Sequence, residues 1–322
     1  MLNAMMRAQV GDDVFGEDPT INELEYLSAS IFGMEAGLFC PSGTMTNQIA
    51  IKVHTQPGNE VICDKTSHVY MYEGGGIAFN SGCQVRTLEG VRGKITSEQV
   101  AEAINPDDVH KPVSSLVTLE NTANRGGGSC YEIEEMAAIQ AVCQERNLRL
   151  HLDGARVFNA IVAKSHDPFA YGKIFDSISI CLSKGLGAPV GSVLIGSKDF
   201  IRQARRVRKV MGGGMRQGGY MAAAGLFALK TNVQRLETDH IHAKQLAEAL
   251  LKKEFVGKML PVETNILIFE VKGSYTATEF VELLAKNDIR CIAISPTQVR
   301  MVTHLDVTEE MIHHTLDTIA AL

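Results

Sequence analysis

The sequence has no uninterrupted apolar run near the roughly 18 residues that a membrane-spanning helix requires. Its first residues, from Met1 to Arg7, lack the basic start, apolar middle and small-residue cleavage site of a secretory signal. Internal repeats and low-complexity tracts are also absent. We therefore expect a soluble, cytoplasmic protein that does not associate with a membrane.

Paired cysteines and an excess of basic residues are also lacking. The seven cysteines are scattered, and no two form a Cys-x-x-Cys pair, which argues against a disulfide framework or a structural zinc site. A His-Glu-x-x-His motif is missing, so we expect no catalytic metal. The 31 Lys and Arg residues are outnumbered by 37 Asp and Glu residues, and this balance does not favour a nucleic-acid partner.

What the sequence does contain is a regular alternation of short apolar runs and longer amphipathic ones. With 322 residues, the chain can form one large domain and a smaller one. The alternation predicts an α/β fold with a mostly parallel, buried sheet. The predicted strands are 60–63, 84–87, 115–119, 149–152, 177–181 and 192–195, and the predicted helices are 46–54, 98–104, 132–146 and 198–210.

The pattern changes after a long helical stretch at about 217–253. Strand patterns at 266–271 and 291–294 then combine with helical patterns at 277–286 and 309–322. We expect a large domain at 1–235 and a small C-terminal α+β domain at 236–322.

Two polar segments that follow predicted strands could carry chemistry. Asp153 follows the run at 149–152, and Lys184 follows the run at 177–181. Ligands of open parallel sheets bind beyond the carboxyl ends of the strands, so both side chains could face one crevice. Pyridoxal phosphate requires such a pair, because a lysine binds its aldehyde and a carboxylate keeps its pyridine nitrogen protonated. On spacing alone, a helix cap and a solvated lysine explain the two residues better.

A third segment, Pro41 to Asn47, opens a helical pattern after an apolar stretch. The unpaired N–H groups of a helix start, together with Ser and Thr hydroxyls, can bind a phosphate. An ordinary Ser/Thr cap is an equally good interpretation of this segment by itself.

Taken together, these segments resemble the low-specificity L-threonine aldolases, which belong to the aspartate aminotransferase-like class (fold type I) of pyridoxal phosphate enzymes. The matching segments occur in the family's order across nearly the whole chain. They are 11–20, 42–47, 67–70, 120–122, 151–156, 182–186, 212–217 and 303–306.

The resemblance implies a role for each matching residue. Lys184 would form the Schiff base with the cofactor, and Asp153 would pair with the pyridine nitrogen. His68 would stack on the cofactor ring, and Gly43 and Thr44 would hold the phosphate. The other cofactor-binding candidates are Ser183, Arg156, Lys209 and Arg216, the last two at the phosphate or at a subunit boundary.

The resemblance also implies how a substrate binds. Arg156 and Arg300 would hold the substrate carboxylate, since the planar guanidinium can pair with both carboxylate oxygens. His110 would lie near the substrate hydroxyl. His68, His110 and an ordered water all remain candidates for the base that removes the hydroxyl proton. Family members are usually homotetramers whose active sites are shared between two subunits.

The expected reaction is therefore retro-aldol cleavage of a β-hydroxy-α-amino acid, such as L-threonine or L-allo-threonine, to glycine and an aldehyde. Alternatives are a β-eliminating lyase or an aminotransferase of the same fold and, less favoured, a non-catalytic module that binds pyridoxal phosphate. The chain departs from the family at Ala123, where the pattern Glu-Asn-Thr-His has its histidine. Family members also usually have a segment resembling Asp-Leu-Arg-Ser-Asp-Thr-Val-Thr ahead of the region that begins here at Met1.

Overall fold

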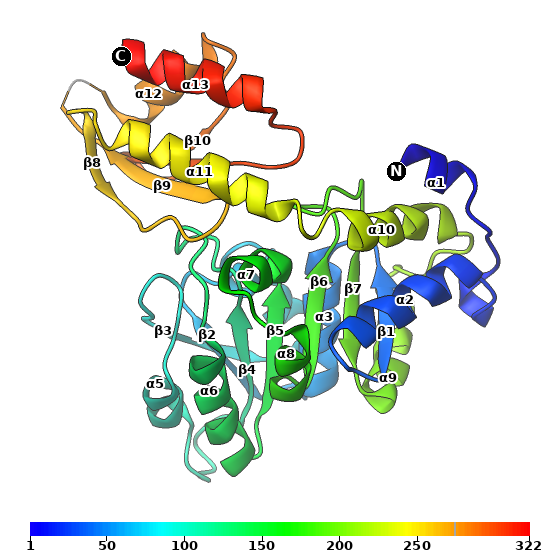
Figure 1. Ribbon diagram of the computed structural model, residues 1–322. Coiled ribbons are helices and arrows are strands. Elements are labelled where there is room, and N and C mark those ends of the chain that lie inside the picture. Colours follow the sequence, from blue (N-terminus) through cyan, green and yellow to red (C-terminus); the bar gives the residue numbers. More distant parts are fainter. Residues whose placement is uncertain (274) are drawn as a thin grey trace.

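The computed structural model describes residues 1–273 and 275–322, which form two β-sheets and the helices that cover them (Figure 1). The larger sheet has seven strands in the order β1-β7-β6-β5-β4-β2-β3. Their bounds in chain order are Ala36–Cys40 (β1), Glu60–Asp64 (β2), Gln84–Leu88 (β3), Ser114–Glu120 (β4), Arg149–Gly154 (β5), Ser177–Cys181 (β6) and Ser192–Gly196 (β7).

The sheet is mostly parallel, as predicted. Strands β6, β5, β4, β2 and β3 run in one direction, whereas β7 pairs antiparallel with both β6 and β1. Each of the six predicted strands is present, with bounds within two residues of those expected. Strand β1 was not among the predicted strands.

Both faces of this sheet are buried, which explains its apolar strands. Alternate side chains point to opposite faces: Leu38 and Leu194 pack with one set of helices, and Phe39 and Val193 pack with the other. The first face is covered by Gly43–His54 (α3) and Lys198–Val210 (α9), and the second by Pro19–Ile31 (α2), Ile133–Glu145 (α6), Val157–Lys164 (α7), Pro168–Ile174 (α8) and Gly219–Thr231 (α10).

The smaller sheet is antiparallel and has the order β10-β11-β9-β8. It has its own apolar core, which includes Leu267, Phe280 and Ile312 and is separate from the core of the large sheet. Its elements are Leu236–Leu250 (α11), Val256–Met259 (β8), Ile266–Val271 (β9), Ala277–Ala285 (α12), Ile292–Ala293 (β10), Gln298–Val302 (β11) and Glu309–Ala321 (α13).

The predicted helical stretch at 217–253 is divided into α10 and α11, and the break between them falls just before Leu236. Several elements were not predicted, namely α2, α7, α8, β8 and β11. The remaining short elements are Leu2–Met6 (α1), Asp13–Phe15 (η1), His68–Met71 (α4), Ile77–Ser81 (η2) and Ser97–Ala103 (α5). Among the helices of residues 1–273 and 275–322, none combines the length and the apolar character needed to cross a bilayer.

Candidate active site

The candidate site is a cavity of about 170 Å³ at the carboxyl ends of β5 and β6. Parallel neighbours end at the same edge of a sheet, so their last residues and the following loops meet there. The start of α3 and the start of α4 complete the wall. The cavity brings together six of the predicted site residues: Gly43, Thr44, His68, Asp153, Ser183 and Lys184.

A second cavity of about 460 Å³ adjoins the first, and Ser183 and Lys184 line both. Arg156 lines this second cavity, together with residues from the segment that follows β11, including His304. Lys184 therefore lies where the large sheet's site opens toward the small sheet. An amine at this position can reach ligands in either space.

Asp153 is the next-to-last residue of β5 and is buried. Its carboxylate accepts one hydrogen bond from the backbone N–H of Ala155 at 3.1 Å and another from Asn47 Nδ2 at 3.0 Å. Gly154 allows the close packing here, because a Cβ at that position would lie 2.5 Å from the carbonyl oxygen of Ser179. These contacts hold the carboxylate in a fixed orientation.

The same Asn47 amide connects Asp153 to the predicted stacking histidine. Asn47 Nδ2 also donates to Glu73 Oε1 at 2.9 Å, and Gln48 Nε2 donates to Glu73 Oε2 at 2.6 Å. Glu73 Oε1 lies 2.9 Å from His68 Nδ1. This hydrogen bond raises the pKa of His68, and the charge of Asp153 acts in the same direction, against the effect of burial. His68, Glu73 and Asp153 offer ligand atoms within 4.8 Å of one another, but Asn47 already donates to both carboxylates.

A chain of buried neutral histidines fixes the orientation of the Asn47 amide. His151 Nε2 lies 3.2 Å from Asn47 Oδ1, and His151 Nδ1 lies 2.8 Å from Ser177 Oγ. Burial lowers the pKa values of His151 and His54 to about 3, so both rings are neutral at pH 7. Since Asn47 Oδ1 can only accept, His151 carries its proton on Nε2 and accepts from Ser177 through Nδ1. His54 Nε2 then donates to Ser177 Oγ at 2.8 Å.

Glu120 is a further buried carboxylate beside the site. It accepts from the backbone N–H of His68 at 2.8 Å and of Asn124 at 2.9 Å. Burial raises the pKa of Glu120 to about 7, and the nearby charge of Asp153 adds to this shift. Glu120 thus ties the start of α4 to the loop after β4.

The two predicted carboxylate-binding arginines come from different sheets. Arg156 follows β5, and Arg300 is the middle residue of β11. Arg300 Nη1 donates to Asn124 Oδ1 at 2.7 Å. Burial lowers the pKa of each guanidinium; the charge of Arg300 lowers that of Arg156 further, whereas the charges of Glu120 and Asp153 raise it. Among the described residues neither guanidinium forms a direct ion pair, and two such cations favour binding of an anion.

The N-terminus of α3 supplies unpaired donors to the same cavity. Ser42 caps the helix, and its Oγ accepts from the backbone N–H of Met45 at 3.2 Å. Within the part of the chain that the structure describes, the N–H groups of Gly43 and Thr44 have no acceptor. Such groups favour an anionic ligand.

Of the remaining predicted site residues, Arg156 lines only the second cavity, Arg300 lines neither cavity, and three are exposed on the single chain. The side chain of His110 is 86 % exposed and bonds to Asp108 in the same turn, so the expected position beside the substrate hydroxyl is not found within one chain. Lys209, at the end of α9, is exposed. Arg216 is also exposed and pairs with Asp12.

Conversely, the sequence reasoning missed four residues that shape the site: Asn47, Glu73, Glu120 and Asn124. Asn47 and Glu120 lie inside segments that were recognised, but no role was given to either. Glu73 lies five residues after His68, in a turn that no periodicity places. The signal available in the sequence was that Glu73 is an acidic residue close enough along the chain to pair with His68.

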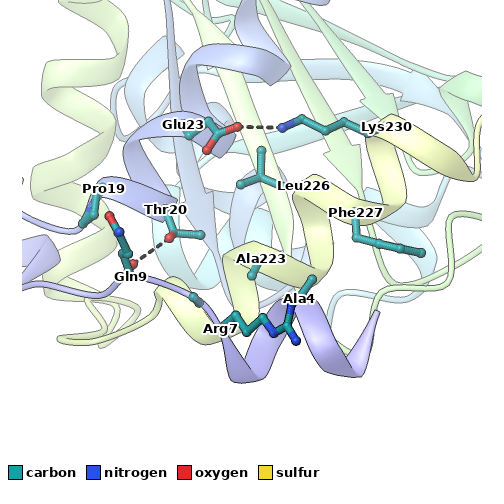
Figure 2. Close-up of a pocket in the computed structure, with 11 residues that line it drawn as sticks. Ala4, Arg7, Gln9, Pro19, Thr20, Glu23, Ala223, Leu226, Phe227 and Lys230 are labelled. Atoms are coloured by element: carbon teal, nitrogen blue, oxygen red, sulfur yellow. Dashed lines mark hydrogen bonds and ion pairs between the residues drawn. The ribbon is translucent and has the colours of Figure 1, made fainter.

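A separate hollow of about 380 Å³ lies among α1, α2 and α10 (Figure 2). Its polar side chains are largely engaged with one another: Lys230 pairs with Glu23 at 2.7 Å, and Thr20 donates to the Gln9 carbonyl at 2.6 Å. It contains none of the predicted site residues. Six of the predicted site residues lie instead in the cavity at β5 and β6.

Comparison with known proteins identifies the family. A model of the beta-eliminating lyase family matches residues 1–274. The low specificity L-threonine aldolase of Escherichia coli strain K12 is 43% identical over 313 residues, which cover 97% of this chain and 92% of that protein. Low-specificity L-threonine aldolase 1 of Arabidopsis thaliana is 40% identical, with 98% and 90% covered.

Solved structures agree on the fold. The threonine aldolase of Leishmania major superposes with a TM-score of 0.84 at 22% identity, over 98% of this chain and 92% of that one. A serine palmitoyltransferase of Sphingomonas wittichii gives a TM-score of 0.78 at 14% identity, over 99% of this chain and 81% of that one. By sequence, the chain belongs to the beta-eliminating lyase family and, within it, to the low-specificity L-threonine aldolases.

Proposed function

We propose that this protein is a pyridoxal phosphate-dependent aldolase that cleaves L-threonine, L-allo-threonine and related β-hydroxy-α-amino acids to glycine and an aldehyde. The observation that carries the proposal is the convergence of Lys184, Asp153 and His68 on one cavity at the carboxyl ends of β5 and β6. The activity printed in the names of the relatives supports it.

The side chains around this cavity fit pyridoxal phosphate. Lys184 offers an amine to an aldehyde, and Asp153 offers a fixed carboxylate to a pyridinium N–H. The free N–H groups of Gly43 and Thr44 suit a phosphate. When bound, the cofactor would supply an electron-accepting ring that stabilises negative charge at Cα of an amino acid.

The arginines would orient the substrate. Arg156 and Arg300 would hold the α-carboxylate by paired hydrogen bonds, which limits rotation about the bond between the amine and Cα. Fixing that rotation selects which bond at Cα breaks. Cleavage of the bond to Cβ yields an aldehyde when the hydroxyl loses its proton.

His68 is the group that we assign to this proton transfer. It lines the cavity, and its Nδ1 hydrogen bond to Glu73 leaves Nε2 free to accept a proton. Glu73 would stabilise the imidazolium that results. His110 is not available for this role within a single chain, because its ring lies on the surface with Asp108.

We further propose that the protein is a cytoplasmic homotetramer, and that its chain divides into a large domain at 1–235 and a small one at 236–322. The separate apolar cores of the two sheets support the division. Exposed Lys209 and Arg216 would serve the phosphate site of a neighbouring subunit.

Glycine release tests the function directly. The purified protein, loaded with pyridoxal phosphate, should release glycine from L-threonine and L-allo-threonine, and Asp153→Ala should reduce turnover by at least about a hundredfold. Asp317→Ala, which removes an exposed aspartate of α13, is the matched control and should keep wild-type turnover. Pyruvate with ammonia would instead indicate a β-eliminating lyase, and an oxo acid an aminotransferase.

Lys184→Ala tests the covalent attachment. Borohydride should fix the cofactor to the wild-type protein and to the exposed control Lys65→Ala, but not to Lys184→Ala. A borohydride-trapped adduct in Lys184→Ala would disprove the assignment.

A further inference from the structure

The candidate site carries more positive charge than a substrate with one carboxylate needs. Arg125, Arg156 and Arg300 have no carboxylate partner among residues 1–273 and 275–322. By contrast, arginines such as Arg86, Arg92 and Arg235 each pair with an acid. Arginine side chains that stay unpaired and partly buried in one region are typical of an anion-binding site.

Arg125 belongs to this group by position. Its Cζ lies 5.9 Å from the centroid of the Tyr72 ring, and the Tyr72 and His68 rings are 5.8 Å apart. A weak contact of 3.5 Å joins Arg125 Nη1 to the carbonyl of Ile294. Arg125 therefore lies beside the Tyr72 ring, which separates it from His68, and next to the segment before β11; it lines neither of the two cavities itself.

Arg300 lies next to Arg125. It donates to Asn124, the residue preceding Arg125, and its buried Nε atom has no hydrogen-bond partner among the described residues. The charge of Arg125 lowers the pKa of the Arg300 guanidinium, second to burial. One N–H of Arg300 thus remains unused in a region where a second cation already raises the cost of holding positive charge.

One substrate carboxylate leaves one of these three arginines without a partner. The α-carboxylate of the substrate would occupy Arg156 and Arg300, and Arg125 would remain without an anion. On the His68 side, where we place the substrate hydroxyl, the nearest substrate atoms are those carried by Cβ. A second anionic group attached to Cβ would meet Arg125.

We propose that this site accepts β-hydroxy-α-amino acids whose side chain is a carboxylate, of which 3-hydroxyaspartate is the simplest; the inference rests on the aldolase function proposed above. The bond between Cα and Cβ breaks, the hydroxyl proton is transferred to the enzyme, and Cα gains a proton. The products are glycine and glyoxylate, so the atoms balance without an oxidant, a reductant or added water.

The test compares L-3-hydroxyaspartate with L-threonine in the loaded enzyme. Wild-type protein should release glycine from both, and in Arg125→Gln the ratio of kcat/KM for hydroxyaspartate to that for threonine should fall about tenfold or more. Arg125→Lys keeps the charge and loses the planar fork, so the ratio should lie between. Arg146→Gln removes an exposed arginine at the end of α6 and should leave the ratio at the wild-type value.

A binding measurement on the unmodified protein is independent of any variant's folding. L-aspartate has both carboxylates and no β-hydroxyl, so it should bind the loaded enzyme more tightly than L-alanine in calorimetry. The difference should shrink with added salt.

Two outcomes separate this inference from the function on which it rests. Three results would overturn the second anion site alone. They are release of glycine from threonine but not from hydroxyaspartate, an unchanged kcat/KM ratio in Arg125→Gln, and binding of aspartate no tighter than that of alanine. No glycine from either substrate would overturn the aldolase function and this inference with it.

Discussion

At the scale of single residues, Asn47 is the point at which the separate parts of the site are connected. Its two amide hydrogens go to Glu73 and Asp153, and its oxygen accepts from His151. Because every polar atom of this amide has a partner, the amide cannot flip without losing hydrogen bonds. The orientations of Asp153 and of the Glu73–His68 pair are therefore linked.

Replacing Asn47 should weaken cofactor binding more than replacing its neighbour Gln48. Asn47→Ala leaves both Asp153 and Glu73 with one donor fewer, whereas Gln48→Ala removes a donor from Glu73 alone. Hydrogen bonds to charged groups contribute about 1.5–3 kcal/mol, so the dissociation constant for pyridoxal phosphate should rise about tenfold or more in Asn47→Ala. Fluorescence titration of the cofactor-free proteins measures it. An equal loss of affinity in the two variants would contradict the link to Asp153.

Glu73 should also set the pH at which His68 titrates. Its hydrogen bond stabilises the protonated imidazole, so His68 loses its proton at a higher pH than an ordinary histidine. Glu73→Gln should lower the pKa of His68, because the hydrogen bond from Glu73 is the largest cause that raises it. If His68 is the base, the rise of kcat/KM on the acid side should move to lower pH by the same amount.

NMR titration of the His68 ring in the cofactor-free protein measures this pKa without any turnover. Glu98→Gln, an exposed glutamate in α5, serves as the control. An equal His68 pKa in Glu73→Gln and in the wild type would show that the Glu73 hydrogen bond does not stabilise the protonated imidazole.

At the scale of elements, helix α3 shows how capping and function coincide. The sequence pattern predicts a helix from residue 46, and the structure begins it at Gly43, because Ser42 caps the preceding turn. That additional turn places the N–H groups of Gly43 and Thr44 in the cavity. The apolar periodicity could not locate this start, since the first turn has few apolar residues.

Ser42→Ala should cost stability and cofactor affinity together. Loss of the cap destabilises a helix by about 1 kcal/mol and lets its first turn fray, which disorders the phosphate donors. Ser197 caps α9 in the same way, but it follows β7, which runs opposite to β6 and so ends at the other edge of the sheet. Ser197→Ala should lose similar stability in thermal unfolding and keep the wild-type affinity for pyridoxal phosphate. Unchanged cofactor affinity in Ser42→Ala would argue against a phosphate site at the N-terminus of α3.

The parallel strands could be predicted because each is a short apolar run with polar ends, buried on both faces. Strand β11 was missed because Gln298 and Arg300 alternate with buried residues, so its apolar content is low. The cavity's predicted residues came from recognised segments, whereas the Asn47–Glu73 and Arg300–Asn124 contacts join segments 26 and 176 residues apart. Local patterns hold no information on such pairs.

At the scale of the whole molecule, the exposed positions of Lys209 and Arg216 lead to a test of assembly. If Lys209 serves the site of a neighbouring subunit, Lys184→Ala and Lys209→Ala chains should each be inactive alone and regain activity after mixed refolding. One site of each hybrid pair would then receive Lys184 from one chain and Lys209 from the other. Glycine release and the mass of the assembly are the measurements.

Lys184→Ala mixed with Asp153→Ala is the control, because both of these residues lie in one cavity of a single chain. This mixture should stay inactive. No recovery in the first mixture would place Lys209 outside the neighbour's site.

The two arginines proposed to bind the carboxylate belong to sheets that pack around different cores: Arg156 lies beside the seven-stranded sheet, and Arg300 lies within the four-stranded one. An amino acid bound by both arginines would link the two sheets, and its release would allow them to move relative to each other. Amide deuterium uptake along β11 should therefore slow when a substrate analogue binds, while uptake along β3, at the far margin of the large sheet, stays constant. Binding at the site would in this way reduce the mobility of the four-stranded sheet, beyond the residues that react.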